Sequence, residues 1–212
     1  MKSGESWDNV WDSVFKNQEW GKYPSEDLIR FIARNFYSSK NRQVVKILEI
    51  GCGPGANLWF AAREGFSVYG IDGSETAISH AKTRLDKEVP GWRGELKVGE
   101  IKDLPFESEF FDAVIDSEAI CCSSYATTKL ISAEVYRVLK SSGKFFSKTF
   151  APGTWENGGL SGKGYTRFTA ESEIVDLYDP LIVEEIDLVE RTIEGIRSGK
   201  SIKEWLISAS KT

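Results

Sequence analysis

A glycine-rich turn between an apolar segment and a helical pattern constrains the fold of this chain more than any other feature. Residues 45–50 read VKILEI, which suits a buried strand, and GCGPG follows at residues 51–55. Glycine has no Cβ and tolerates positive φ, so the turn can bring bare backbone close to a ligand. The helical pattern from Ala56 adds unpaired N–H groups at its start. The sequence therefore predicts a ligand site at the carboxyl end of the first strand of an open sheet.

Strand-like and helical segments alternate after this turn, which favours a parallel sheet covered by helices on both faces. Two strand-like segments in succession near the end of the chain predict an antiparallel hairpin. The predicted class is therefore α/β, with a doubly wound, mostly parallel, seven-stranded Rossmann-like sheet and an antiparallel C-terminal hairpin. Gly143 is expected just past the end of a helix, and Thr169 is expected to cap one. The expected strands are residues 45–50, 67–71, 96–98, 111–116, 144–150, 181–193 and 202–208, and the expected helices are residues 56–64, 75–87, 128–139 and 169–177.

The N-terminal part of the chain has a different character from these alternating segments. Residues 7–36 carry apolar side chains at helical spacing in two pieces, which are separated by a break at residues 20–24. Ser25 is the expected N-cap of the second piece. Polar residues 38–43 then indicate a linker. The predicted division is an N-terminal helical cap, residues 1–43, and a core, residues 44–212.

Composition and charge argue against several other classes of protein. The 212 residues carry a net charge of −5 without a dense Lys/Arg cluster, so nucleic acid is not an expected partner. No apolar run is long enough to span a bilayer and the first residues lack a secretory h-region, so we expect no membrane association. Three cysteines without metal-ligand spacing and a lone histidine, His80, predict no metal and a reducing, cytoplasmic location. The oligomeric state stays open.

Two acidic residues flank the predicted ligand site. Asp72 ends the second strand 21 residues after Gly51, where an acid accepts hydrogen bonds from the ribose of a nucleoside ligand. The alternative is that Asp72 caps the helix that begins near Glu75. Glu49 lies two residues before Gly51, where it would repel a pyrophosphate and attract a cation. Glu49 and the spacing GxGxG, in place of GxGxxG, disfavour a nicotinamide-dependent dehydrogenase.

The combination of Glu49 with the GxGxG turn resembles motif I of the class I S-adenosylmethionine-dependent methyltransferases. GIDGS at residues 70–74 and VGEIKDLPF at residues 98–106 are similar to the family segments that bind ribose and adenine. FFDAVID at 110–116, EVYRVLK at 134–140 and EWLI at 204–207 resemble later strands and a helix of the same fold. The resemblance implies S-adenosylmethionine as the cofactor. It implies the following cofactor-binding residues: Glu49, Gly51, Cys52, Gly53, Asp72, Gly73, Glu100, Ile101 and Asp116.

The chain departs from the family pattern in three places. Glu100 stands where Asp is commoner, and Ser141-Ser142-Gly143 replaces a proline-glycine-glycine turn. After the fourth strand the chain lacks the asparagine-proline-proline-tyrosine signature of some nucleic-acid and amide methylating enzymes. This last departure favours a small-molecule acceptor.

Methyl transfer from a sulfonium is an in-line displacement, so the protein chiefly has to align the reactants and exclude water. A general base is needed only when the acceptor must lose a proton. The catalytic residues therefore stay unassigned, with Asp116 and Glu118 as candidates after the fourth strand. Trp20 and Tyr23 are predicted to form a lid that closes over the cofactor, and Trp155, in a glycine-rich loop, is predicted to form an apolar wall for the acceptor.

The function expected from the sequence is methyl transfer from S-adenosylmethionine to a small-molecule acceptor. Two alternatives stay open. One is methylation of a protein or tRNA, which binding that weakens steeply with salt would indicate. The other is a non-catalytic module that binds S-adenosylmethionine. The acceptor and its reacting atom are not encoded in any motif that we find.

Overall fold

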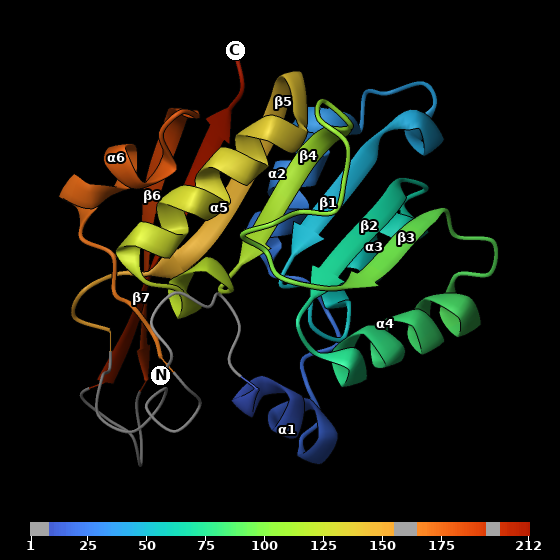
Figure 1. Ribbon diagram of the computed structural model, residues 1–212, viewed down its shortest axis with the longest axis horizontal. Coiled ribbons are helices and arrows are strands. Elements are labelled where there is room, and N and C mark those ends of the chain that lie inside the picture. The colour runs from blue at the N-terminus through green and yellow to red at the C-terminus, as the bar shows by residue number, and fades with distance from the viewer. Residues whose placement is uncertain (1–8, 155–164, 194–199) are drawn as a thin grey trace.

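The computed structural model describes residues 9–154, 165–193 and 200–212, and one seven-stranded sheet organises them (Figure 1). The strands lie in the order β3-β2-β1-β4-β5-β7-β6. The first five are parallel, and β7 pairs antiparallel with both β5 and β6. This arrangement confirms the predicted fold class and the C-terminal hairpin. The strands are β1 (Lys46–Ile50), β2 (Ser67–Asp72), β3 (Gly94–Val98), β4 (Phe111–Ser117), β5 (Leu139–Phe150), β6 (Ile182–Ile193) and β7 (Lys200–Ser210).

The order of the strands reverses at β1, and this reversal defines the ligand edge of the sheet. The chain runs outward from β1 through β2 to β3 and then returns to β4 on the other side of β1. Ile50 of β1 pairs with Ile71 of β2 and with Asp116 of β4, so the carboxyl ends of three parallel strands meet. Ligands of open α/β sheets bind in the crevice outside such a switch point.

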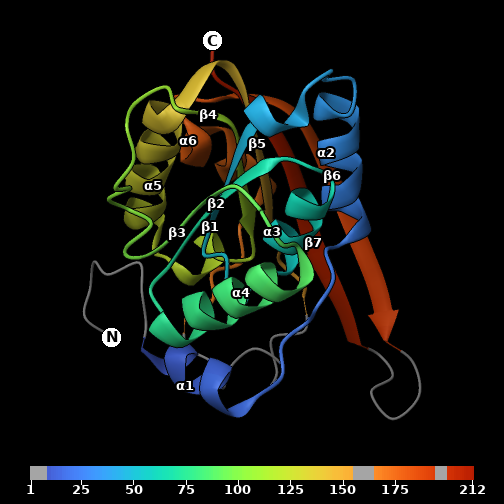
Figure 2. The same ribbon diagram turned by 90° about the vertical axis from the view of Figure 1, so that its right-hand side faces the viewer.

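Helices cover both faces of the sheet (Figures 1 and 2). In β1, Ile47 packs into the core on one face, while Leu48 and Ile50 pack into the core on the other. Both faces of the central strands are therefore apolar, which explains their nearly continuous hydrophobic sequences. The helices on the Ile47 face are α2 (Glu26–Phe36), α3 (Ala56–Arg63) and α4 (Glu75–Glu88), and those on the opposite face are α5 (Tyr125–Val138) and α6 (Ile174–Tyr178).

Serine side chains fix the start of three helices. Ser25 Oγ accepts a hydrogen bond from the Leu28 N–H at 3.4 Å, which confirms the predicted N-cap of α2. Ser74 and Ser124 cap α4 and α5 in the same way, at 3.1 and 3.2 Å. Each cap satisfies an N–H group that the helix itself leaves unpaired and typically contributes about 1 kcal/mol.

The predicted boundary between α5 and β5 is wrong. The helix begins at Tyr125 rather than at residue 128, and the chain passes directly into β5 at Leu139. Gly143 therefore lies within β5 and does not end the helix. The cause is the pairing of the two strands, because Phe111 at the start of β4 pairs with Leu139 before a shift in register.

The predicted cap at Thr169 is also wrong. The Thr169 N–H donates to the Phe150 carbonyl at 2.9 Å, and the Thr169 carbonyl accepts from Trp205 Nε1 at 2.8 Å. These bonds hold the segment against the sheet. The N-cap of the short helix η3 (Glu171–Glu173) is Ala170, one residue later than predicted, and its N–H donates to the Glu173 carboxylate at 2.8 Å.

The two N-terminal helices occupy different places. α2 buries Leu28, Phe31 and Ile32 against the sheet, and the Phe31 ring lies 5.2 Å from that of Phe146 in β5. The first helix, α1 (Val10–Asn17), instead contacts α4 and lies across the carboxyl edge of the sheet (Figure 2). Of these two helices, only α1 is placed to cover a ligand at that edge.

Two negative findings apply to the residues that the structure describes. None of their helices combines the length and the apolarity needed to cross a membrane. Their His, Cys, Asp and Glu side chains form no group of three or more that is arranged to hold a metal ion.

Candidate active site

A cavity of about 460 Å³ opens at the carboxyl edge of the sheet, beside the glycine turn. This volume lies within the usual range for small-molecule sites. Its walls come from the loops after β1, β2, β3 and β4, from the end of β5, and from α1 with the segment that follows it. The cavity therefore lies where the strand order predicts a ligand.

Backbone conformation and close packing both require glycine in this turn. Gly51, Gly53 and Gly55 have φ values of 64°, 50° and 79°, in the left-handed region that favours glycine. A Cβ at Gly51 would lie 2.2 Å from the Cβ of Ala119, so the turn presses against the loop after β4. Gly53 has more room, with the Phe15 ring 3.6 Å from its Cβ position, and it lines the cavity.

Asp72 organises the backbone around the cavity. One carboxylate oxygen accepts from the Gly53 N–H at 2.8 Å and the other from the Ser74 N–H at 2.9 Å. Because Ser74 is the N-cap of α4, Asp72 is not the cap itself. Burial raises the pKa of Asp72, and the two backbone hydrogen bonds oppose the rise. The side chain lines the cavity, and each of its oxygens has a second lone pair for a ligand hydroxyl.

Glu49 is a buried acid with an unsatisfied oxygen. Its side chain lines the cavity and is 2% exposed. Oε1 accepts from Asn57 Nδ2 at 2.6 Å, whereas Oε2 has no hydrogen-bond partner among the described residues. Burial raises the pKa of Glu49 to about 8, and the nearby Asp72 and Asp116 carboxylates contribute to the rise. Such a group is stabilised by a cation or a hydrogen-bond donor from a ligand.

The sequence predicts that Asp116 binds the cofactor, but its side chain lies away from the cavity. The side chain is fully buried and, within the described part of the chain, does not belong to the cavity wall. It accepts from the N–H groups of Ala119 and Ile120, both at 3.0 Å, and from Ser147 Oγ at 2.6 Å. Burial raises its pKa to about 6. Asp116 thus shapes the loop after β4.

The remaining predicted cofactor-binding residues lie in the loops after β1, β2 and β3, and not all of them line the cavity. Cys52, Gly73 and Ile101 line the cavity, together with Gly99. Glu100 is next to both Gly99 and Ile101 in sequence, but it is not among the described residues that form the wall. The adenine end of the predicted ligand would therefore meet backbone and an apolar side chain at this strand.

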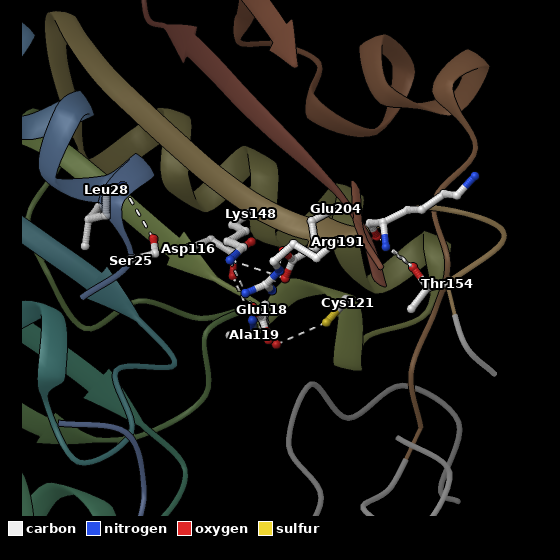
Figure 3. Close-up of polar contacts among 11 residues, drawn as sticks. Ser25, Leu28, Asp116, Glu118, Ala119, Cys121, Lys148, Thr154, Arg191 and Glu204 are labelled. Atoms are coloured by element: carbon white, nitrogen blue, oxygen red, sulfur yellow. Dashed lines mark hydrogen bonds and ion pairs between the residues drawn. The ribbon is translucent and has the colours of Figure 1, made fainter. Parts of the chain in front are cut away.

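An ion-pair chain flanks the cavity on the side of β4, β5 and β7 (Figure 3). Lys148 Nζ lies 3.6 Å from Glu118 Oε1 and 3.2 Å from Glu204 Oε1, and Arg191 approaches Glu204 Oε2 at 2.8 Å. Glu118 and Lys148 line the cavity, and Lys148 and Glu204 are buried. We call these four residues the ion-pair chain. The sequence analysis found Glu118 as a site candidate, but it missed Glu204 and Arg191.

Aromatic side chains from the N-terminal segment cover the cavity. The rings of Trp11 and Phe15 lie 5.9 and 5.4 Å from Trp20, and all three line the cavity. Tyr23 also lines it and packs edge-on against Trp59 at 5.5 Å. This arrangement places Trp20 and Tyr23 where a lid is predicted. Trp155, the predicted apolar wall, lies outside the described residues.

A polar contact attaches α1 to α4. Asp12 of α1 accepts hydrogen bonds from Ser74 Oγ at 2.6 Å and from the Thr76 N–H at 3.3 Å, and it pairs with Lys16 at 2.6 Å. The hydrogen bonds from Lys16, Ser74 and Thr76 hold the pKa of Asp12 well below its usual range. These hydrogen bonds therefore attach α1, which covers the cavity, to α4, the helix that follows Asp72.

These features define a Rossmann-like protein with a nucleoside-type site at the switch point of its sheet. Residues 47–143 match the family model described as a methyltransferase domain. This match covers just under half of the chain, and it confirms the resemblance to the class I S-adenosylmethionine-dependent methyltransferases.

The similar proteins support this assignment over different lengths. The ubiquinone biosynthesis O-methyltransferase of Bartonella quintana is 32% identical over 120 residues, which are 55% of this chain and 45% of that protein. The chain spans 36% to 45% of the length of the curated relatives it matches.

Two solved structures share the fold. The structure titled "Conversion of a Disulfide Bond into a Thioacetal Group during Echinomycin Biosynthesis" has a TM-score of 0.76 at 19% identity, covering 96% of this chain and 91% of that one. A structure titled as a SAM-dependent methyltransferase from Methanosarcina mazei has a TM-score of 0.68 at 22% identity, covering 85% of this chain and 96% of that one.

Proposed function

We propose that this protein binds S-adenosylmethionine in the cavity and catalyses methyl transfer to a small-molecule acceptor. The observation that carries the proposal is the buried carboxylate oxygen of Glu49 beside the glycine turn, which has no hydrogen-bond partner among the described residues. An isolated buried carboxylate is costly, and a positively charged ligand compensates for it. A pyrophosphate, which is an anion, would not.

The residues of the cavity fit the parts of this cofactor. Glu49 would hold its positively charged end, and Asp72 would accept hydrogen bonds from the ribose hydroxyls. Gly99 and Ile101 would face the adenine. When bound, the cofactor supplies a methyl group activated by a sulfonium. The chain then has to orient the acceptor and exclude water, and the aromatic side chains of α1 and the following segment are positioned for the second task.

A small acceptor suits the shape and setting of the site. Aromatic side chains cover the cavity, and its total volume of about 460 Å³ has to hold both the cofactor and the acceptor. The relative from Bartonella quintana is named as an O-methyltransferase of ubiquinone biosynthesis, which supports a small acceptor here. Cys52, Cys121 and Cys122 are all free thiols, which is consistent with a reducing, cytoplasmic setting as part of this proposal.

Calorimetric titration tests the proposal directly. We expect S-adenosylmethionine and its demethylated product, S-adenosylhomocysteine, to bind, and NAD⁺ not to bind. Asp72→Asn should weaken binding about tenfold to a hundredfold, because it removes a charged acceptor for ribose hydroxyls. Asp86→Asn is the matched control, since Asp86 is a half-exposed acid on α4 that pairs with Lys82. Binding of NAD⁺, or of none of the three compounds, would reject the proposal.

An acceptor screen that detects S-adenosylhomocysteine separates an enzyme from a binding module. Turnover with a small molecule supports the proposal. Tight cofactor binding without turnover of any small-molecule, protein or tRNA acceptor would indicate a non-catalytic module. Turnover restricted to protein or tRNA, with activity that falls steeply as salt rises, would identify a macromolecular acceptor.

A further inference from the structure

The ion-pair chain presents balanced charge to the cavity. Its two carboxylates and two cations sum to a formal charge of zero. Glu118 and Lys148 are its two members on the cavity wall, and Glu204 links Lys148 to Arg191 (Figure 3). An anionic ligand placed against this pair would meet the Glu118 carboxylate, and a cationic ligand would meet the Lys148 ammonium. The site therefore favours a neutral ligand that offers one hydrogen-bonding hydroxyl.

The backbone holds Glu118 in a fixed position. Its φ of 63° is in the left-handed region, which is strained for a residue with a side chain. The strained residue is braced on both sides, because its N–H donates to the Lys148 carbonyl at 2.8 Å and its carbonyl accepts from Cys121 Sγ at 3.0 Å. Asp116 fixes the next turn of the loop. Such strain is common at functional sites, where neighbouring contacts maintain it.

Aromatic side chains line the same cavity as this pair. Phe150, two residues after Lys148 at the end of β5, lines the cavity, as do Trp20 and Tyr23 of the N-terminal segment. Aromatic surfaces bind flat rings through stacked or edge-to-face contacts. The cavity thus offers an aromatic lining next to one carboxylate and one ammonium group.

We propose that the acceptor is a neutral phenol whose hydroxyl binds between Glu118 and Lys148, with Glu118 receiving its proton and Lys148 stabilising its oxygen. This inference rests on the proposed function and names the class of its acceptor. The acceptor oxygen forms a bond to the methyl carbon, its proton passes to the Glu118 carboxylate, and the electron pair of the broken carbon–sulfur bond stays on sulfur. The products are an aryl methyl ether and S-adenosylhomocysteine.

The protonation of Glu118 suits this role. Burial raises the pKa of Glu118 to about 7, with Lys148 opposing the rise and Glu204 adding to it. The titratable groups that face Glu118 among the described residues are Lys148 on β5, Glu204 on β7, and the thiols of Cys121 and Cys122 on its own loop. A base that titrates near the working pH is the most effective at accepting a proton during transfer.

Three probes of matched shape test the charge preference: phenol, benzoate and benzylamine. Their dissociation constants are measured by calorimetry at pH 8, above the pKa of Glu118, with S-adenosylhomocysteine held at saturation. We expect the wild-type protein to bind phenol at least about tenfold more tightly than either charged probe, because a buried like charge is unfavourable. A wild-type protein that prefers benzoate or benzylamine, or that binds all three alike or not at all, overturns the inference.

Two variants should shift this preference in opposite directions. Glu118→Gln leaves a net positive ion-pair chain and should strengthen benzoate binding about tenfold. Lys148→Met removes the ammonium group that repels a cation and should strengthen benzylamine binding by a similar factor. A general loss of structure would not produce opposite changes. Shifts in the same direction contradict the inference, and if Lys148→Met does not fold, Glu118→Gln and the wild-type preference decide it.

Glu109→Gln is the matched control. Glu109 also has a positive φ, 56°, and pairs with a lysine, Lys211, at 3.3 Å, but it precedes β4 at the opposite edge of the sheet. Its probe preference should equal that of the wild type, and a shift like that of Glu118→Gln would contradict the inference. If S-adenosylhomocysteine fails to bind the wild-type protein, the proposed function itself is wrong. If it binds and the probes do not discriminate, only the acceptor class is wrong.

Discussion

The two ends of the cavity are built in different ways. The end formed by β1, β2 and β3 uses bare backbone and two acids, Glu49 and Asp72, that lie within 24 residues of each other in the sequence. The end formed by β4, β5 and β7 uses side chains that are far apart in the sequence, as the pairing of Lys148 with Glu204 shows. The first end is suited to a ligand that does not change, such as a cofactor. The side chains of the second end can change with the acceptor without altering the cofactor end.

Gly51→Ala should have the largest effect, because it affects the contact between the two ends. The new Cβ would lie 2.2 Å from that of Ala119, at a φ that alanine disfavours. We expect a loss of about 2–4 kcal/mol in the free energy of unfolding, measured by denaturant titration, and S-adenosylmethionine binding weakened at least about a hundredfold. Gly91→Ala is the control, since Gly91 also has a positive φ, 81°, but its Cβ position has no described atom within 4 Å. Equal effects of the two substitutions would contradict the packing described.

Glu49→Gln should have the next largest effect on S-adenosylmethionine binding. This effect should be confined to the cofactor end of the cavity. Because the pKa of Glu49 is raised to about 8, the acid holds a proton at pH 7 until a cationic ligand favours its ionised form. S-adenosylmethionine binding to the wild type should release nearly one proton at pH 7 and tighten as pH rises toward 8. The variant should release none and bind about tenfold to a hundredfold more weakly.

The proton count comes from calorimetry in buffers with different heats of ionisation. The same substitution has a predictable effect on the free protein. A folded-state pKa above the unfolded value means that the native protein binds more protons, so its stability falls as pH rises between about 4.5 and 8. Glu49→Gln should abolish this part of the pH dependence of unfolding. Binding with no proton release would contradict the assigned state of Glu49.

Glu204→Gln should change the acceptor end alone. The Glu204 carboxylate contributes to the raised pKa of Glu118, so its removal should lower that pKa. Benzoate binding weakens as Glu118 ionises, with a midpoint near pH 7 in the wild type, and the variant should shift this midpoint to lower pH. Glu190→Gln, which removes a half-exposed partner of Lys203, should leave the midpoint unchanged. A shift in S-adenosylmethionine affinity above about twofold would show that the two ends are coupled.

The sequence predicts the cofactor end more completely than the acceptor end, for a physical reason. Glu49, the glycines and Asp72 belong to one strand–helix–strand unit, so their positions follow from local order along the chain. Glu204 comes from the antiparallel pairing of β7 with β5, and Arg191 from that of β6 with β7, and no local pattern reveals either register.

Burial causes the other differences between expectation and structure. Asp116 lies near the end of the apolar strand β4, and the sequence does not show that its side chain accepts a hydrogen bond from Ser147 instead of lining the cavity. The sequence does not reveal the end of α5 either, because β5 begins with the pairing of Leu139 to Phe111, before Gly143 is reached. Both outcomes depend on contacts with residues distant in the sequence.

Asp12→Asn should have the smallest effect on S-adenosylmethionine binding. It affects α1, which lies over the cofactor end of the cavity. It weakens the hydrogen bonds from Ser74 and Thr76 that tie α1 to α4. We propose that α1 and the segment to Pro24 act as a lid, so S-adenosylmethionine should bind at most about fivefold more weakly, with faster amide exchange in α1. Glu26→Gln, in an exposed pair with Arg30 on α2, is the control. Unchanged exchange in α1 would contradict the lid.

The most direct test of the whole account is a crystal structure of the protein with S-adenosylhomocysteine. The account predicts the ligand at the carboxyl ends of β1, β2 and β3, with its amino group within hydrogen-bond distance of Glu49 Oε2 and its ribose at Asp72. It also predicts that the space beside Glu118 and Lys148 stays free for the acceptor. A ligand bound elsewhere, or a ribose placed against Lys148, would contradict it.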